Sequence, residues 1–171
     1  MKRTLRTAVY LLCVAAALAP AMAFDGLPAD PATCASPMPS ARNFLLRDLD
    51  NQKWTFSSTR GKVVLVDFWA TWCVPCKVEI PAFVDLYARY KANGLEVVGI
   101  SMDTDPAAMK SFAAEYKMTY PILRGTDNVT RTWGVEGLPT TVLVGRDGKV
   151  CRKFVGQTPL EQFEQLVKSL L

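Results

Sequence analysis

The sequence predicts an α/β domain in which a mixed β-sheet lies between layers of helices. Residues 63–69 and 95–101 are almost continuously apolar, which is typical of strands buried on both faces. A segment with helical spacing of apolar residues follows each run, and the chain ends with two shorter apolar runs and a further helical pattern. This alternation, closed by a hairpin and a helix, indicates a mixed sheet flanked by helices.

The first half of the pattern begins with a short β-hairpin. Residues 44–49 and 53–56 read as strands on either side of Asp50-Asn51, a pair that suits a turn. The first buried strand comes next. The spacing of apolar side chains then predicts a helix over 74–93, which Asn93-Gly94 ends as a C-cap.

The second half follows the strand over 95–101. Pro106 stands in the first turn of a predicted helix, where its missing N–H costs nothing. The remaining expected elements are a strand over 120–123, one or two helical turns over 128–133, a hairpin of 140–144 and 149–155 around Arg146-Asp147-Gly148, and a helix from Pro159 to Leu170.

Length and composition limit the possible functions. A chain of 171 residues supports one ordinary domain with a sizeable core, and 50% apolar with 21% charged residues is a folded composition. The sequence contains no histidine. This excludes a Ser–His or Cys–His nucleophile pair, zinc ligation by histidine and haem attachment through CxxCH. The cysteines are therefore the obvious carriers of chemistry.

Residues 1–23 have the anatomy of a secretory signal peptide. Three basic residues precede an uncharged run over 7–19, Pro20 breaks the run, and Ala21-Met22-Ala23 forms a small-residue cleavage site. We therefore expect export to the periplasm. The alternative is a segment that stays uncleaved and anchors the protein in the inner membrane.

Cleavage would leave a proline-rich tail over 24–41 and a folded domain over 42–171. The chain after residue 23 carries 17 basic and 16 acidic residues, so no basic patch points to nucleic acid.

Four cysteines remain after the signal peptide, and two of them form a CxxC motif. Cys73 and Cys76 follow the first buried strand directly and open the predicted helix. Unpaired N–H groups at a helix N-terminus favour a thiolate. A redox dithiol therefore fits this motif best. A zinc site would need a second pair of ligands, and the sequence has neither another CxxC motif nor a histidine. A purely structural disulfide is a weaker interpretation, because so small a loop would restrain little chain entropy.

Two motifs now make the sequence similar to a known group. Residues 42–171 resemble the exported TlpA/ResA-like proteins, which have the thioredoxin fold with an N-terminal β-hairpin and a central strand–helix insertion, here between Val97 and Leu123. The matching residues are Val66–Cys76 (VDFWATWCVPC), Glu79, Pro81 and Trp133–Thr141 (WGVEGLPTT).

The resemblance implies roles at the CxxC motif. Cys73 is expected to be the attacking thiol, exposed at the helix tip, and Cys76 the more buried resolving thiol. Pro139 matches the cis-proline that faces the dithiol, so Leu138-Pro139 would offer backbone groups to an extended substrate segment. Two further residues, Trp72 and Pro75, are expected to frame the substrate site, whereas Trp69 suits either the site or the core.

Two carboxylates are candidates for accepting the proton of Cys76. Asp67 lies six residues before Cys73, and Glu79 lies three residues after Cys76 on the same helix. Thioredoxins carry a buried aspartate at the position of Asp67 and a lysine that accompanies it. By resemblance, Gly99 stands here in place of that lysine. Without that partner, burial should raise the pKa of Asp67 and suit it to base catalysis near neutrality.

The predicted activity is an exported thiol–disulfide oxidoreductase that acts mainly as a reductase of specific protein disulfides. By resemblance, its clients belong to cytochrome c or copper-site (respiratory oxidase) assembly, and its electrons come from a membrane thiol–disulfide carrier. We also expect a monomer without cofactor or metal. Two alternatives remain: a thiol-dependent peroxidase of the peroxiredoxin type and a copper(I)-carrying module that uses Cys73 and Cys76.

The other two cysteines predict a structural disulfide. Cys34 lies in the proline-rich tail and Cys151 in the final hairpin. Free thiols are a hazard in an oxidising compartment, and the tail would cover an exposed sheet edge by crossing it. The alternative is a tail thiol at Cys34 and a small buried side chain at Cys151.

Overall fold

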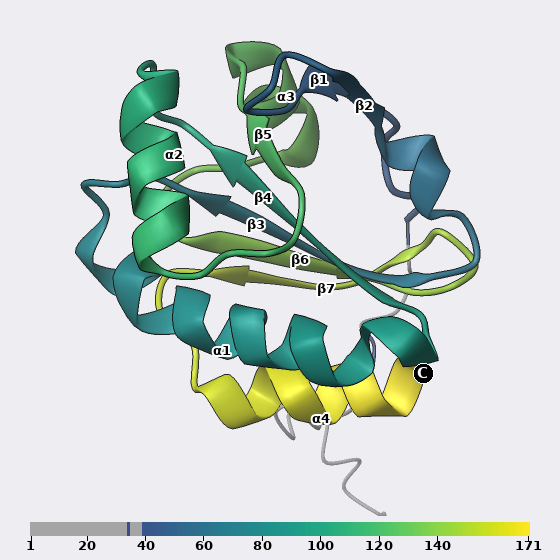
Figure 1. The fold of residues 1–171 in the computed structure, drawn as a ribbon. Coiled ribbons are helices and arrows are strands. Elements are labelled where there is room, and N and C mark those ends of the chain that lie inside the picture. Colours follow the sequence, from purple (N-terminus) through teal and green to yellow (C-terminus); the bar gives the residue numbers. More distant parts are fainter. Residues whose placement is uncertain (1–33, 35–38) are drawn as a thin grey trace, which may run out of the picture.

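A five-stranded sheet with the order β5-β4-β3-β6-β7 forms the centre of the fold in the computed structural model, which describes Cys34 and residues 39–171 (Figure 1). The elements are β1 (Leu45–Arg47), β2 (Lys53–Thr55), β3 (Val63–Trp69), α1 (Val74–Tyr90), β4 (Leu95–Ser101), α2 (Pro106–Glu115), β5 (Ile122–Arg124), α3 (Asp127–Trp133), β6 (Thr140–Val144), β7 (Val150–Val155) and α4 (Leu160–Leu170). Strands β3, β4 and β5 are parallel, whereas β6 is antiparallel to β3 and to β7. The mixed sheet flanked by helices confirms the predicted α/β class.

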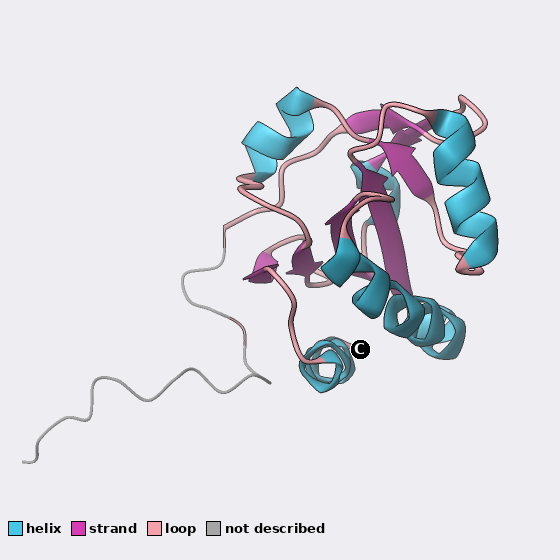
Figure 2. Ribbon diagram, turned by 90° about the vertical axis from the view of Figure 1, so that its left-hand side faces the viewer, coloured by secondary structure: helices cyan, strands magenta, loops and turns pink. Residues whose placement is uncertain are grey.

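Helices and a hairpin cover the two faces of the sheet (Figure 2). On one face, α1 and α4 pack together through an edge contact between Phe83 and Phe163, whose ring centroids are 5.0 Å apart. On the other face, α3 packs against the hairpin side of the molecule, with Trp133 5.3 Å from Phe56. All seven residues of β3 are buried, so its side chains alternate between these two cores.

The element boundaries follow backbone chemistry. Strands β3, β4 and β6 have the predicted bounds. Helix α1 ends at Tyr90, and a single 3-10 turn leads to Gly94 at φ 99°. Strand β5 starts two residues later than predicted. Pro121 has no N–H to donate to a ladder, although its carbonyl accepts the N–H of Gly99.

Strand β7 forms one edge of the sheet, and residues 39–41 pair antiparallel with residues 148–150 at its start. Val150 N donates to the Pro39 carbonyl at 2.8 Å, and a disulfide joins Cys34 to Cys151, with the Cα atoms 4.5 Å apart. The signal peptide predicted over 1–23 and most of the tail lie outside the described residues. Within the part of the chain that the structure does describe, no helix has the length and apolar character needed to cross a bilayer.

Replacing Cys34 and Cys151 together with alanine should lower the free energy of unfolding by about 3–5 kcal/mol, because the bond closes a loop with a sequence separation of 117. Denaturant unfolding of the oxidised protein measures this loss. Each single variant should lose nearly as much as the double variant, since either substitution breaks the bond. A double variant with the unfolding free energy of the wild type would contradict the prediction. So would a loss in the double variant equal to the sum of the losses in the two single variants.

Candidate active site

The CxxC motif lies where β3 passes into α1. The Cys73–Cys76 disulfide spans the N-terminus of the helix, with 5.3 Å between the Cα atoms. Cys73 is the N-cap residue, and its Sγ accepts the backbone N–H of Cys76 at 3.3 Å. Pro75 sits in the first turn, where it costs no hydrogen bond. The helix N-terminus therefore directs N–H groups and its positive dipole end toward Cys73.

The expected exposure of Cys73 is wrong for the oxidised protein. Its exposed fraction is 4%, and that of Cys76 is 1%. Cys73 is bonded to Cys76 and lies in the core cluster, so its neighbours in the chain take the exposed positions. Trp72 is 67% exposed and Val74 is also exposed. The disulfide is thus rimmed by apolar side chains that contact solvent.

Asp103 holds the loop that precedes Cys73. Its carboxylate accepts the backbone N–H of Thr71 at 2.8 Å and the Thr71 hydroxyl at 2.7 Å, and Ser101 donates a third hydrogen bond at 2.7 Å. The sequence reasoning missed this residue. Its position in the sequence could have indicated it, because Asp103 follows β4 closely and β4 is a parallel neighbour of β3. The carboxyl ends of two parallel strands meet at the same end of the sheet, so Asp103 lies near the loop that follows β3.

The predicted cis-proline lies at the same end of the sheet. The Leu138–Pro139 peptide bond is cis, as the resemblance implies. Thr140 pairs with Phe68 at the end of β3, which brings Pro139 level with the start of the CxxC loop. Pro139 is buried, its carbonyl accepts the N–H of Gly156 at 2.8 Å, and Leu138 packs against the core cluster that contains both cysteines.

Asp67 is buried in the middle of β3, with an exposed fraction of 1%. Strand alternation places it on the face that packs against α1, because Leu65 and Trp69 belong to that core. Its Oδ1 accepts a long hydrogen bond of 3.5 Å from Thr141 Oγ1, and its Oδ2 has no partner among the described residues. Burial raises the pKa of Asp67 well above its ordinary value, and the neighbouring Glu79 carboxylate raises it further, against the lowering effect of Thr141.

Glu79 is buried on α1 rather than solvated, also with an exposed fraction of 1%. Its Oε1 accepts the backbone N–H of Thr158 at 2.7 Å, while its Oε2 has no partner in the described part of the chain. Burial raises the pKa of Glu79 to about 7, and the hydrogen bond from Thr158 opposes this shift. Thr158 is 79 residues from Glu79 in sequence, and none of the motifs indicated that the two residues would be in contact.

Gly99 is the register partner of Asp67 on β4. A Cβ atom at Gly99 would lie 2.9 Å from Trp69 Nε1 and 3.3 Å from Tyr120 Cε2. These two aromatic side chains therefore occupy the space that a side chain on Gly99 would need. Trp69 is fully buried and stacks on Phe112 at 4.9 Å, so it belongs to the core rather than to the rim of the site.

The structure brings together most of the predicted site. Trp72 directly precedes Cys73, and Pro75 lies between the two bonded cysteines. The buried acids lie on the side of the sheet that α1 covers. No group of three or more metal-binding side chains occurs among the residues that the structure describes. The chemistry available here is thiol–disulfide exchange at a helix N-terminus, with two buried carboxyl groups on the same side of the sheet whose pKa values burial raises.

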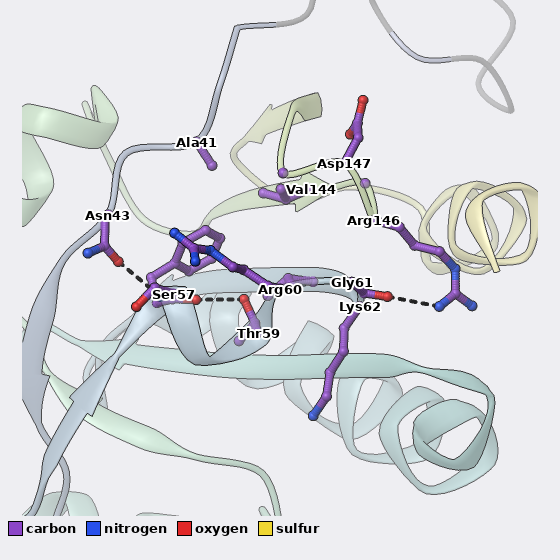
Figure 3. Close-up of a pocket in the computed structure, with 14 residues that line it drawn as sticks. Ala41, Asn43, Ser57, Thr59, Arg60, Gly61, Lys62, Val144, Arg146 and Asp147 are labelled. Atoms are coloured by element: carbon purple, nitrogen blue, oxygen red, sulfur yellow. Dashed lines mark hydrogen bonds between the residues drawn. The ribbon is translucent and has the colours of Figure 1, made fainter.

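A cavity of about 390 Å³ opens at the opposite end of the sheet (Figure 3). Val64 and Val144, which pair across β3 and β6, form part of its lining, whereas none of the predicted site residues does. Arg146 lies at its edge and donates to the Gly61 carbonyl at 3.0 Å. This cavity is therefore separate from the disulfide chemistry.

Comparison with known proteins now gives the class. The chain is a thiol–disulfide oxidoreductase with the thioredoxin fold, because curated relatives and solved structures agree on both the activity and the architecture. Residues 38–153 match the AhpC/TSA family, and the chain belongs to that family, among its ResA-type thiol–disulfide oxidoreductases.

The relatives cover most of this chain. It is 35% identical over 131 residues to the thiol-disulfide oxidoreductase ResA of Bacillus anthracis, which spans 76% of each chain. With ResA of Bacillus subtilis it is 33% identical over 132 residues, covering 75% of this chain and 74% of the relative. A Chlorobium tepidum structure described as a thiol:disulfide interchange protein DsbE is 31% identical at a TM-score of 0.71, covering 78% of this chain and 96% of that one.

Replacing Glu79 with glutamine should make stability less sensitive to pH. Folding raises the pKa of Glu79 from 4.5 to about 7. Between these two pH values the unfolded chain has lost the proton of Glu79 while the folded protein still holds it. The free energy of unfolding of the wild type therefore falls as the pH rises from 4.5 to about 7. Glutamine keeps an oxygen for the Thr158 N–H and does not titrate. We expect Glu79→Gln to gain stability over the wild type between pH 5 and pH 8, by up to about 3 kcal/mol.

Denaturant unfolding of both oxidised proteins at each pH measures this difference. Glu161→Gln is a matched control, since Glu161 is exposed on α4 and should not change the pH dependence. A difference between Glu79→Gln and wild type that stays constant from pH 5 to pH 8 would contradict the assignment.

Proposed function

We propose that this protein is an exported, periplasmic reductase of specific protein disulfides that serves cytochrome c or copper-site assembly. The Cys73–Cys76 disulfide at the N-terminus of α1, with the buried carboxyl groups of Asp67 and Glu79 on the side of the sheet that α1 covers, is the observation that carries the proposal. Two disulfides in one chain also support an oxidising compartment. The relatives named ResA and DsbE support the class of reaction.

In the reductive direction, the Cys73 thiolate attacks one sulfur of a client disulfide. The second client sulfur leaves as a thiolate, and a mixed disulfide forms through Cys73. Cys76 then attacks the Cys73 sulfur, so the Cys73–Cys76 disulfide closes and the client leaves with both cysteines reduced. Two electrons pass to the client, and a membrane thiol–disulfide carrier returns two electrons to the protein.

The second attack requires Cys76 to lose its proton. Asp67 and Glu79 are suited to accept it, because burial holds their pKa values high and each has a carboxylate oxygen that no described group engages. The proton thus moves from the Cys76 thiol to a carboxylate within the protein rather than to bulk water.

The client segment would bind across the end of the sheet. Trp72 and Pro75 offer apolar contact on one side of the disulfide, and Leu138, which precedes the cis bond to Pro139, offers its backbone groups on the other. Main-chain recognition of this kind gives affinity for an extended segment, while the exposed indole of Trp72 favours apolar client residues near the cysteine.

Trapping tests the proposal directly. In the full chain with Cys76→Ser, Cys73 keeps its attack but cannot be released, so mixed disulfides with a few client proteins should accumulate in the periplasm. The double variant Cys73→Ser, Cys76→Ser is the control and should trap nothing, since Cys34 and Cys151 are bonded to each other. Separation under non-reducing conditions, followed by identification of the bound proteins, measures the result.

Two outcomes would contradict the proposal. The client proteins identified by trapping should accumulate with their disulfides intact in cells that lack this protein. Accumulation of those client proteins in the reduced form would reverse the assigned direction. The match to the AhpC/TSA family makes peroxide the competing substrate. Fast peroxide consumption by the reduced protein, with no trapped client, would favour a peroxidase instead.

A further inference from the structure

Four buried polar atoms lie in the core beside α1 without a hydrogen-bond partner among the described residues. They are Asp67 Oδ2, Glu79 Oε2, Trp69 Nε1 and the Tyr120 hydroxyl. A buried polar group without a partner is costly, so native proteins rarely leave several unpaired at one place unless they are used. The reaction described above uses Asp67 and Glu79 but gives no role to Tyr120.

The ring of Tyr120 lies over the strand position next to Asp67. Its Cε2 is 3.3 Å from the point where a Cβ on Gly99 would be, and Gly99 pairs directly with Asp67 across β3 and β4. The side chain is only 4% exposed, and Tyr87 on α1 packs edge-on against it at 6.0 Å. This packing fixes the ring, so the hydroxyl has a defined position in the buried region that contains Asp67.

Few groups on the surrounding elements can interact with the Asp67 carboxyl group. Helix α1 contributes Cys76 and Glu79, strand β6 contributes Thr141, and the segment before β5 contributes Tyr120. Thr141 makes only a long hydrogen bond, and Glu79 carries the same charge. Two unpaired donors therefore remain near this position, Trp69 Nε1 on the same strand and the Tyr120 hydroxyl from the segment before β5. The indole of Trp69 is held in the core by its stacking on Phe112. Burial first, and then the Asp67 carboxylate, raise the pKa of the Tyr120 hydroxyl, which keeps its proton available for donation.

The two groups make no hydrogen bond to each other in the oxidised protein. We propose that Tyr120 is a positioning residue for Asp67, and that its hydroxyl donates a hydrogen bond to the Asp67 carboxylate when that group is ionised. The bond stabilises the ionised form and so makes the carboxylate available to receive the Cys76 proton, while Tyr120 keeps its own proton throughout. This inference rests on the proposed role of Asp67 in releasing the mixed disulfide. The central strand–helix insertion, which carries Tyr120, would thus influence the proton step through Asp67.

Tyr120→Phe tests the proposal, because phenylalanine keeps the ring over Gly99 and removes only the hydroxyl. Losing a hydrogen bond to a charged group should raise the titration midpoint of Asp67 by about one pH unit. The pH profile of mixed-disulfide release should move to higher pH by the same amount, with release about tenfold slower below the wild-type midpoint. Formation of the mixed disulfide by Cys73 should be unchanged.

Carbon-13 NMR of labelled aspartate follows Asp67 directly, and single-turnover kinetics follow release. Tyr87→Phe is the control, since Tyr87 touches the same ring but interacts with Glu96 through its hydroxyl. It should shift neither quantity. In an Asp67→Asn background, Tyr120→Phe should have no further effect on release, because its influence acts through Asp67.

An unchanged Asp67 titration in Tyr120→Phe would overturn the proposal, and so would an equal shift in Tyr87→Phe. A shifted titration with an unchanged release profile would instead support the contact and overturn the role of Asp67 in release.

Discussion

The burial of the Asp67 carboxyl group inside β3 is the constraint on which the rest of the site depends. Every other residue of that strand is apolar, and the strand is covered on both faces. A carboxylate in such a place strongly favours its protonated form. Gly99 keeps the neighbouring strand position free of a side chain, and Trp69 and Tyr120 fill the space, so no side chain on Gly99 supplies a compensating charge.

The scaffold presents the disulfide to a client while keeping the acids away from water. The end of β3 and the hydrogen bonds from Thr71 to Asp103 fix the CxxC loop, and the first turn of α1 directs its N–H groups toward Cys73. The same helix carries Glu79 to the buried side of the sheet. In the proposed function, the exposed apolar rim of the site recognises a client, the buried carboxyl groups hold the proton of Cys76, and the cysteines lie between the two.

Local sequence patterns predicted the parts of the site that depend on local chemistry. The apolar run of β3, the CxxC motif at a helix start and the cis Leu138–Pro139 bond follow from strand burial, helix capping and motif resemblance. Sequence patterns could not predict contacts made by loops that meet only after folding. The hydrogen bond from the Thr158 N–H to Glu79 and the placement of the Tyr120 ring over Gly99, the strand partner of Asp67, are of this kind. The burial of Cys73 was missed for a related reason, since it depends on the bond to Cys76 and on packing around it.

The central claim is that Asp67 accepts the proton of Cys76 during release of the mixed disulfide. Single-turnover reduction of a disulfide-bonded peptide by wild type and by Asp67→Asn, measured across a pH series, tests it most directly. The account predicts that Asp67→Asn slows release by about 10²-fold or more near neutral pH, the scale of a lost general base, and leaves formation of the mixed disulfide unchanged. Equal release rates in the two proteins at every pH would contradict the account.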